Sequence, residues 1–390
     1  MSNKIKDFIN IKNQFPMLQN DLIYLDSSAL VQKPESVIKA INDFYTKFSI
    51  SNRTSDSKIG ILVNNKIEDT RQKVANLLNA SKDEIIFNSG TTEGLNYIAQ
   101  LLVSLIKKDD EILISKYNHS SHIIPWIEIS KITEAKIIFS DNLINDINNK
   151  TKIIAFTQSN NNFQQKINIQ DLSNKAKKYQ ALIINDAAQA ISHEEVNAKY
   201  FDAIAFSSNK FFGPTGLGIL YINKNLLTKI KSKKYGGGTV EKIEENGQWT
   251  RKPSIIQHEA GTLNLSAIFG FYEALVFYEN IDKEAMKKYL KDLSIYAHKK
   301  LRNIKDIVVL SKSEDFIILF EVKNISAQDI SSYLGHKNIY VRSGYFCAQY
   351  LQYVHNNPTI RVSLHIYNDK KDIDVLCDLL NHKEDFLDFI

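Results

Sequence analysis

Short apolar runs alternate with longer amphipathic stretches across the first two thirds of the chain. The apolar runs lie at residues 84–87, 111–115, 136–139, 152–157, 181–185 and 203–206. Most are apolar throughout, which is typical of strands that helices cover on both faces. Between them, apolar residues recur at helical spacing, as over 69–78 and 169–179. The pattern predicts an open, mostly parallel α/β sheet between about residues 85 and 222.

The pattern of apolar and polar residues changes after residue 265. A long helical stretch is followed by strand patterns at 307–310 and 316–322, a helix near 327–334 and a polar amphipathic C-terminal segment. We therefore expect a large domain over 26–265 and a smaller α+β domain over 266–390, with residues 1–25 packing against the smaller one. Residues 231–253, which contain the triple glycine 236–238, have no clear periodicity and predict a mobile loop that crosses between the domains.

Composition narrows the classes of protein that fit. With 390 residues and 43% hydrophobic content, the chain can bury two cores. Its net charge of +5 is spread over 49 basic and 44 acidic residues without aromatic residues interleaved among the basic runs, so no nucleic-acid partner is expected. No apolar run approaches the roughly 20 residues of a membrane span. Two cysteines, Cys347 and Cys377, are too few for a disulfide framework and favour a reducing, cytoplasmic location.

The segment Asn88-Ser89-Gly90-Thr91-Thr92-Glu93 follows one predicted strand and opens a helix. Its hydroxyls and free backbone N–H groups could cradle a phosphate. An ordinary capped helix start, with Glu93 in the first turn, accounts for about half of such patterns without any ligand. The segment alone leaves both readings open.

Two further residues follow predicted strands. Asp186 ends a buried run, at the strand end where α/β sheets bind ligands. A buried carboxylate needs a partner, and a protonated pyridine nitrogen is a suitable one, although a helix cap is the simpler explanation. Lys210 follows the next run, between Ser207-Ser208-Asn209 and Phe211-Phe212-Gly213. Most lysines are solvated surface groups, but one among apolar neighbours suits a Schiff-base nucleophile.

The order of phosphate cradle, acid and lysine resembles the fold-type I pyridoxal-phosphate (PLP) enzymes of aminotransferase class V. From Tyr24 to its last helix the chain is similar to the cysteine desulfurases, in particular the Suf-type group. Each matching block is weak alone, and jointly they are specific. The blocks are Tyr24-Leu25-Asp26, Gln32-Lys33-Pro34, Gly90-Thr91-Thr92-Glu93, Asn118-His119-Ser120, Pro125-Trp126, Asn160-Asn161, Asp186-Ala187-Ala188-Gln189-Ala190, Asn209-Lys210, Gly213-Pro214-Thr215-Gly216, Gly236-Gly237-Gly238, Glu259-Ala260-Gly261-Thr262, Val341-Arg342-Ser343-Gly344 with Cys347-Ala348, and Arg361 with Ser363-Leu364.

The resemblance implies a fold and a cofactor site. The large domain would bind PLP and hold a mostly parallel, seven-stranded sheet, the small α+β domain would carry the catalytic cysteine loop, and the chain would form a homodimer. Lys210 would carry PLP as a Schiff base, Asp186 would pair with its pyridine nitrogen, and His119 would stack on the ring and relay protons. The remaining cofactor contacts implied are Asn161 and Gln189 near the ring hydroxyl, Thr91, Thr92 and Ser207 at the phosphate, Asn209 beside the lysine, and Thr262 at the phosphate of the partner subunit.

The resemblance also implies how substrate and sulfur are handled, and it implies no metal. Arg361 would clamp the substrate carboxylate with its planar fork, beside Asn161 and the backbone of Ala29. Cys347 would attack the sulfur of L-cysteine, leaving L-alanine and a persulfide for a Suf-type scaffold or sulfur-relay protein. A lone cysteine is more often a small buried hydrophobe, and Cys377 is assigned to packing. The short interval between Cys347 and Arg361 favours the Suf-type group over the Nif/Isc-like group.

The chain departs from the family pattern at several positions. Residues 27–30 read Ser-Ser-Ala-Leu where Asn-Ala-Ala is usual, and Asn52, Asp56 and Asn209 stand where histidines are frequent. Tyr345 and Phe346 replace two histidines that commonly precede the nucleophile. The competing hypotheses are selenocysteine lyase or another class V PLP reaction such as transamination, and a degenerate docking protein in sulfur trafficking. The presence of the lysine, aspartate, cysteine and arginine argues against the last.

Overall fold

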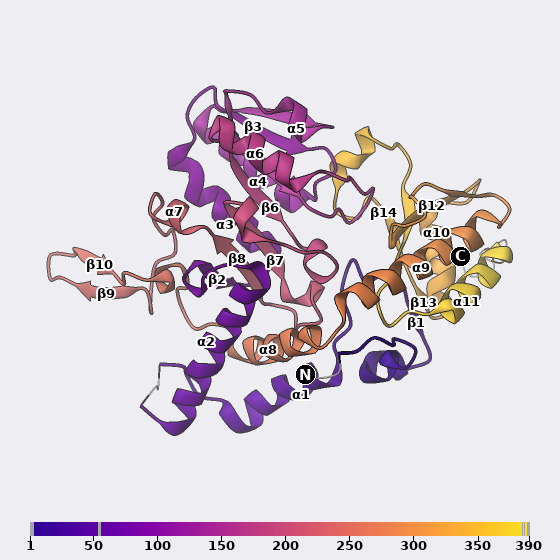
Figure 1. The fold of residues 1–390 in the computed structure, drawn as a ribbon, viewed down its shortest axis with the longest axis horizontal. Helices are drawn as coiled ribbons and strands as arrows, with labels where there is room; N and C mark the ends of the chain where they lie inside the picture. The colour runs from indigo at the N-terminus through magenta and orange to yellow at the C-terminus, as the bar shows by residue number, and fades with distance from the viewer. Residues whose placement is uncertain (1–3, 54–55, 384, 386, 388–390) are drawn as a thin grey trace. The chain divides into compact units, whose positions relative to one another are not determined.

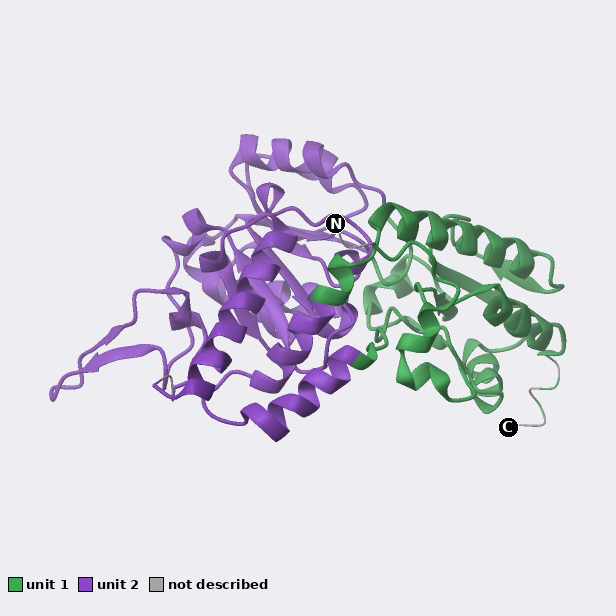
Figure 2. Cartoon of the chain, turned by 60° about the horizontal axis from the view of Figure 1, so that its bottom comes forward, with its two compact units in different colours: residues 1–35, 160–165, 276–390 green, residues 36–159, 166–275 purple. Residues whose placement is uncertain are grey.

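The computed structural model describes residues 4–53, 56–383, 385 and 387, and the chain divides into two compact units (Figure 2). Unit 1 comprises residues 1–35, 160–165 and 276–390, and unit 2 comprises 36–159 and 166–275. Residues 160–165 thus group with the two chain ends, and the division falls at 275/276 rather than at 265/266. The domain limits expected from the sequence stay a prediction.

Unit 2 is built on a seven-stranded sheet, mostly parallel, as predicted. One strand, β8, runs antiparallel to both of its neighbours, and the other adjacent pairs are parallel. Residues of the central strands are nearly all buried, which explains why they read as continuous apolar runs. In spatial order the strands are β2 (Ile85–Asn88), β8 (Gly218–Ile222), β7 (Ala203–Ser207), β6 (Leu182–Asp186), β5 (Thr151–Thr157), β3 (Glu111–Ser115) and β4 (Lys136–Ser140).

Helices pack around this sheet (Figure 1). Helix α2 (Lys58–Leu78) is twice the predicted length, because Ser57 caps it and accepts a hydrogen bond from the Gly60 N–H. It ends at Asn79, whose left-handed conformation stops the helix. The others in this part of the chain are α1 (Glu35–Asp43), α3 (Thr91–Leu102), α4 (Ile124–Thr133), α5 (Leu143–Asp146), α6 (Ile169–Tyr179), α7 (Lys224–Leu227) and α8 (Leu265–Glu279).

The segment predicted as an irregular loop between domains contains a hairpin, so that prediction was wrong. Strands β9 (Val240–Ile243) and β10 (Trp249–Arg251) pair antiparallel, and both belong to unit 2. Figure 1 shows the hairpin extending from the body of this unit. Its residues are mostly exposed and charged, so they lack the apolar alternation by which a strand is recognised.

Unit 1 holds an antiparallel sheet in the order β11 (Ile307–Val309), β12 (Ile317–Val322), β15 (Thr359–Ser363) and β14 (Arg342–Gly344). Helices α9 (Lys283–Arg302), α10 (Ala327–His336) and α11 (Lys370–Asn381) build a core with it, and Cys377 is buried in that core, as predicted. Near the N-terminus, β1 (Ile23–Tyr24) pairs in parallel with β13 (Ile339–Tyr340). The α+β character predicted for the C-terminal part is confirmed.

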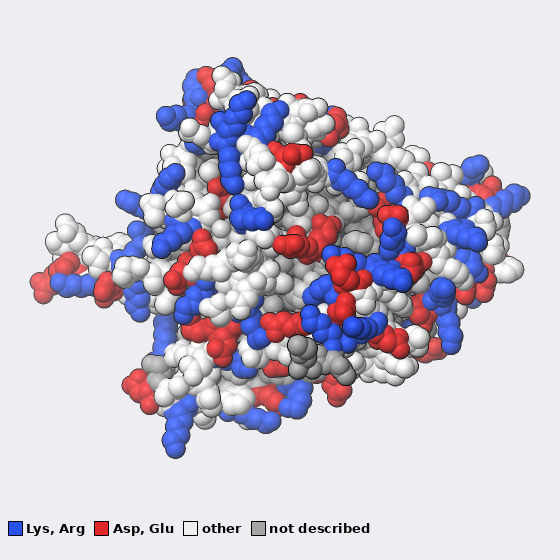
Figure 3. Space-filling view, in the orientation of Figure 1, with Lys and Arg blue, Asp and Glu red and all other residues white. Residues whose placement is uncertain are grey.

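The surface carries both signs of charge. On the face drawn in Figure 3, Lys and Arg side chains are interspersed with Asp and Glu side chains. Among the described helices, none combines the length and the apolar character needed to cross a membrane.

Candidate active site

The residues predicted to hold the cofactor lie in unit 2, except Asn161, which belongs to unit 1. Several of them lie at the carboxyl ends of the parallel strands. Asp186 is the last residue of β6, in register with Thr157 at the end of β5, and Ser207 is the last residue of β7. Lys210 follows within the short helical turn Ser208–Lys210. Parallel strands bring these ends to one edge of the sheet, where α/β folds bind ligands.

Asp186 is 4% exposed and accepts a hydrogen bond of 3.0 Å from the Ala188 N–H. Burial raises the pKa of Asp186 to about 6, against the opposing effects of that hydrogen bond and of the Lys210 charge. The two predicted residues are therefore close enough to interact electrostatically. A buried carboxyl group with a pKa near neutrality is suited to share a proton with a ring nitrogen.

A cluster of hydroxyls lies at the N-terminus of α3. The Thr91 N–H donates to Ser207 Oγ over 2.7 Å, and Thr91 Oγ1 lies 2.8 Å from the same oxygen. The Gly90 N–H donates to Asn88 Oδ1, and a Cβ at Gly218 would overlap this Asn88 oxygen and the Gly90 backbone. The turn between strand and helix is thus closed tightly around a pair of hydroxyls.

The alternative of an ordinary capped helix start is met only in part, because the N-cap of α3 is Gly90, without a side-chain cap, and Glu93 lies in the first turn. Glu93 Oε2 accepts a hydrogen bond of 2.7 Å from the Ser89 N–H, and Glu93 pairs with Lys234 at 2.5 Å. These contacts lower the pKa of Glu93, although its burial opposes them. Glu93 therefore bonds back to the turn before the helix, whereas the hydroxyls of Thr91 and Ser207 bond to each other.

His119 and Thr92 both contact Ser121. His119 Nδ1 accepts a hydrogen bond from the Ser121 N–H over 3.1 Å, and Thr92 Oγ1 lies 2.8 Å from Ser121 Oγ. The neighbouring His122 is fully buried with Nε2 3.0 Å from the Ile184 carbonyl oxygen, and burial lowers its pKa to about 4. His122 is a neutral structural histidine. Sequence reasoning missed Ser121, which directly follows the block Asn118-His119-Ser120.

The remaining cofactor residues of unit 2 lie on turns. Gln189 is buried in the turn that follows β6, and Asn209 is half-buried beside Lys210. Thr262 is exposed, three residues beyond Glu259. The arginine of α2, Arg71, donates to both carboxylate oxygens of Glu259, over 2.8 and 2.9 Å.

This anchored segment borders a cavity. Glu259 also accepts a hydrogen bond of 2.7 Å from the Phe87 N–H of β2, which fixes the segment to the sheet. Arg53 Nη2 donates to the Gly261 carbonyl oxygen over 3.0 Å. A cavity of about 510 Å³ lies here, and its lining includes Arg53, Arg71, Lys252 and Gly261.

The residues predicted to bind substrate and sulfur lie in unit 1, on and beside the β14–β15 pair. Arg342 of β14 stands directly opposite Arg361 of β15. Opposed residues of an antiparallel pair project from the same face of the sheet. Cys347 lies on the loop between these strands, is exposed, and has its Sγ 3.8 Å from Arg342 Nη2.

The backbone at the cysteine is unusual. Phe346 and Cys347 have φ values of 55° and 58°, so two consecutive non-glycine residues adopt the left-handed conformation. Each such residue costs on the order of 1–2 kcal/mol, and such strain concentrates at functional sites. The loop is therefore held in place by its surroundings and not by local preference.

Arg361 is 1% exposed. Its Nη2 donates to Asp26 Oδ1 over 2.6 Å and its Nη1 to the Asn161 carbonyl oxygen over 3.1 Å. Its Nε is buried without a hydrogen-bond partner among the described residues. The sequence did not reveal that Asp26 holds this arginine. Ala29, predicted to offer its backbone, donates its N–H to the Asp26 carbonyl oxygen over 2.9 Å.

The side chains present fit PLP and an amino-acid substrate. Asp186 offers a buried acceptor for a pyridinium N–H, and Lys210 offers an amine within its electrostatic reach. Thr91 and Ser207 offer hydroxyls at a helix N-terminus, a suitable setting for phosphate. In unit 1, the unpaired Nε–H of Arg361 is a donor that a carboxylate would satisfy.

Comparisons with known proteins agree with these features. Residues 23–376 match the aminotransferase class-V family. A probable cysteine desulfurase of Ureaplasma parvum is 35% identical over 382 residues, which cover 94% of this chain and 95% of the relative. An apo cysteine desulfurase of Thermococcus onnurineus superposes with a TM-score of 0.88 at 26% identity, covering 96% of this chain and 97% of that one. The Escherichia coli cysteine desulfurase CsdA gives 0.89 at 26% identity, with 97% and 98% covered.

Proposed function

The chain belongs to the aminotransferase class-V family and is a PLP-dependent cysteine desulfurase, and from this premise we propose which residues carry the reaction. One observation carries the assignment: each unit offers one half of the required chemistry. Unit 2 offers a buried acid beside a lysine at the strand ends. Unit 1 offers an exposed thiol beside an arginine and, across the strand pair, a buried arginine with an unused donor.

In unit 2 the proposed roles follow from the chemistry of each side chain. PLP, when bound, supplies an electron-poor ring that stabilises negative charge at the substrate Cα. The Lys210 amine holds the cofactor covalently and moves the Cα proton, and the Asp186 carboxylate accepts the pyridine N–H. His119 covers the ring. Thr91, Thr92 and Ser207 hold the phosphate, and Asn209 and Gln189 complete the surroundings of the cofactor.

In unit 1, Arg361 binds the substrate carboxylate. Its Nε–H meets no acceptor in the part of the chain that the structure describes, and Nη2 already donates to Asp26. Ala29 and Asn161, which both contact the Asp26–Arg361 pair, line the substrate. Guanidinium offers two parallel donors to a carboxylate, so the amino acid is oriented as well as held.

Cys347 takes the sulfur. Its thiolate forms a bond to the substrate sulfur as the substrate C–S bond breaks, and the electron pair of that bond stays on the three-carbon fragment. The fragment takes up a proton and leaves as L-alanine, so the enzyme keeps a persulfide. Arg342 Nη2, 3.8 Å from Sγ, places a positive charge beside the sulfur during the attack.

Several finer features are proposals of the same kind. The enzyme is a homodimer in which Thr262, on its exposed and anchored segment, contacts the phosphate in the partner subunit. The persulfide passes to a Suf-type scaffold or sulfur-relay protein, and the chain belongs to the Suf-type group. Both cysteines are free in the structure, which supports a cytoplasmic location.

Two measurements test the assignment. Borohydride reduction followed by peptide mass spectrometry should find the cofactor on Lys210, and an adduct on a different residue would refute that role. The parent should release sulfide and L-alanine from L-cysteine under reductant, which separates desulfuration from transamination. A comparison of L-cysteine with L-selenocysteine as substrates separates cysteine desulfurase from selenocysteine lyase.

A variant tests the nucleophile. Cys347→Ala should keep the cofactor absorbance near about 400 nm and lose about 10³-fold in sulfide release. An unchanged rate would mean that another group is the nucleophile.

A further inference from the structure

Phe346, the residue directly before Cys347, is 4% exposed although its neighbour is exposed. It packs in a small cluster with Ile317 and Leu319 of β12 and with Phe163. Its side chain therefore anchors the start of the loop that carries the thiol.

The Phe346 ring lies over the guanidinium that the proposed function assigns to the substrate. Arg361 Cζ is 4.7 Å from the ring centroid, in a site that excludes water from the arginine. Cation–π attraction is strongest when the cation is desolvated, as it is here. The ring thus adds to the Asp26 ion pair in stabilising a buried positive charge, whose Nε has no hydrogen-bond partner among the described residues.

Asn161 connects Arg361 and Phe346 through two hydrogen bonds. Its Nδ2 donates to the Phe346 carbonyl oxygen over 2.8 Å, and its own carbonyl oxygen accepts from Arg361 Nη1. Arg361, Asn161 and Phe346 are therefore joined in pairs, through backbone and side chain. A change at the guanidinium acts on both the ring and the backbone of Phe346.

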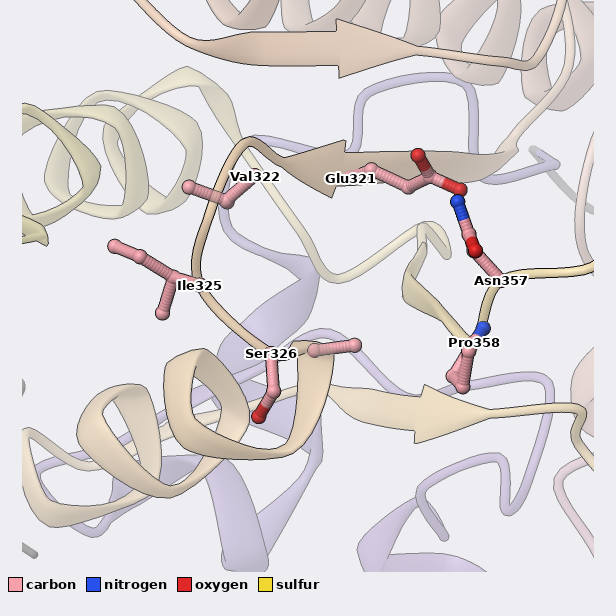
Figure 4. Close-up of a pocket in the computed structure, with 7 residues that line it drawn as sticks. Glu321, Val322, Ile325, Ser326, Asn357 and Pro358 are labelled. Atoms are coloured by element: carbon pink, nitrogen blue, oxygen red, sulfur yellow. The ribbon is translucent and has the colours of Figure 1, made fainter.

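The far end of the loop is fixed by a separate contact. His355 Nε2 lies 2.5 Å from Glu321 Oε1 on β12. Beyond it, Asn357 and Pro358 line a cavity of about 240 Å³ in which Glu321 and Asn357 point toward one another (Figure 4). The His355 ring also packs edge-on against Phe163 of the Phe346 cluster, at 5.6 Å between ring centroids. Removing the charge of Glu321 therefore changes the ion pair at the far end and leaves this ring packing in place.

We propose that Phe346 is a positioning residue that links occupation of Arg361 by a carboxylate to the placement of the Cys347 thiol. The inference rests on the proposed role of Arg361. Asp26 already pairs with the guanidinium, and a second carboxylate at Nε draws further positive charge away from the ring face, which weakens the contact with Phe346. The left-handed pair Phe346–Cys347 is held against its local preference, so a loosened Phe346 frees the next residue to move. The thiol becomes mobile when an amino acid is bound, which is when it must reach the sulfur.

The test measures how fast iodoacetamide alkylates Cys347 in the holoenzyme, with and without saturating L-alanine. L-Alanine carries the substrate's carboxylate and no sulfur, so it forms no persulfide, and its saturation is followed by the cofactor absorbance. Peptide mass spectrometry separates alkylation of Cys347 from that of the buried Cys377. In the parent, L-alanine should raise the rate about tenfold, which lies between the ratios expected for loss of an exposed and of a fully desolvated cation–π contact.

The variants separate this link from simple packing. Phe346→Leu keeps an apolar filler but has no π face, so L-alanine should change its alkylation rate less than about twofold. Phe346→Met, with a more adaptable filler, should behave alike and guards against misfolding of the leucine variant. Phe346→Tyr should restore the tenfold response. Glu321→Gln, which weakens the anchor at the far end of the loop, is the matched control and should keep the response.

Two results from the comparison of parent and variants would overturn the inference, and so would one from the parent alone. One is a full response to L-alanine in both Phe346→Leu and Phe346→Met. The other is a decrease in rate with L-alanine in parent and variants alike, which would mean that the bound amino acid merely shields the thiol. Sulfide release from L-cysteine tests the proposed function in the same preparation. A parent that releases sulfide but whose alkylation ignores L-alanine therefore overturns the inference alone.

Discussion

The two units fix their functional residues in different ways. In unit 2, Asp186 and Ser207 are the last residues of buried strands in a seven-stranded sheet, so the backbone ladder sets their positions. In unit 1, Cys347 lies on the loop between the edge strand β14 and its neighbour β15, in a left-handed conformation, held by a few side-chain contacts. The difference matches the proposed tasks. A cofactor needs a rigid, preorganised cradle, whereas a thiol that accepts sulfur and passes it on has to be exposed and able to move.

The largest effect is expected when Lys210, the residue proposed to hold the cofactor in unit 2, is replaced. Lys210→Ala should lose both the covalent cofactor and about 10⁴-fold in sulfide release, because the same amine holds the cofactor and moves the proton. The contrast is with Cys347→Ala, which should lose sulfide release and keep the absorbance. Absorbance spectra and a sulfide assay on both variants measure it. If Lys210→Ala kept a borohydride-stable cofactor adduct, another residue would hold the cofactor and the role proposed for Lys210 would be wrong.

A smaller effect concerns the buried acid of unit 2. The pKa of Asp186 is raised from 3.8 to about 6 by burial, so between these values the native apoprotein binds more protons than the unfolded chain. The protonated acid stabilises the native state below about pH 4, and about 3 kcal/mol is lost as the pH rises through 6.

Asp186→Asn should be free of this dependence. Urea unfolding of the apoproteins from pH 4 to pH 7 measures the difference between parent and variant, which cancels the opposite contribution of buried histidines such as His122. If the free energy of unfolding changed with pH in the same way in parent and variant, burial would not raise the pKa of Asp186. Bound PLP should flatten the dependence in the parent, because its pyridine N–H compensates the carboxylate.

In unit 1, Arg361→Lys should raise the KM for L-cysteine about 30-fold, because an ammonium keeps the charge but not the parallel donors. The cofactor absorbance should not change, which marks the effect as one of substrate binding. Steady-state kinetics with the spectrum of the resting enzyme check this. A loss of cofactor in this variant would mean that the two sets of residues are not separable.

The smallest expected effect is at the exposed arginine beside the thiol. Arg342→Gln should slow alkylation of Cys347 at pH 7 about threefold, since an exposed charge is partly screened by water and salt. Raising the ionic strength should reduce the difference between parent and variant. An equal rate in both proteins would remove Arg342 from the proposed mechanism.

Much of unit 2 could be predicted from the sequence, because its strands are buried on both faces and read as continuous apolar runs. The strand Glu111–Ser115 and the helix Ile169–Tyr179 match their predicted bounds. The hairpin β9–β10 could not be predicted in this way, since exposed strands lack an apolar pattern. The strand β8, which begins at a glycine and runs against the others, was also not singled out.

The chain sequence by itself determined which side chains are available and in what order. The strand–turn–helix pattern placed Asp186 at a strand end, and the spacing of apolar residues assigned Cys377 to the core. Only the tertiary structure decided the contacts between residues far apart in the chain. Asp26 pairs with Arg361, Arg342 lies opposite Arg361 and near Cys347, and Phe346 covers the guanidinium. Local sequence encodes local conformation and burial, whereas contacts across strands depend on register and on loop closure, which follow from packing of the whole unit.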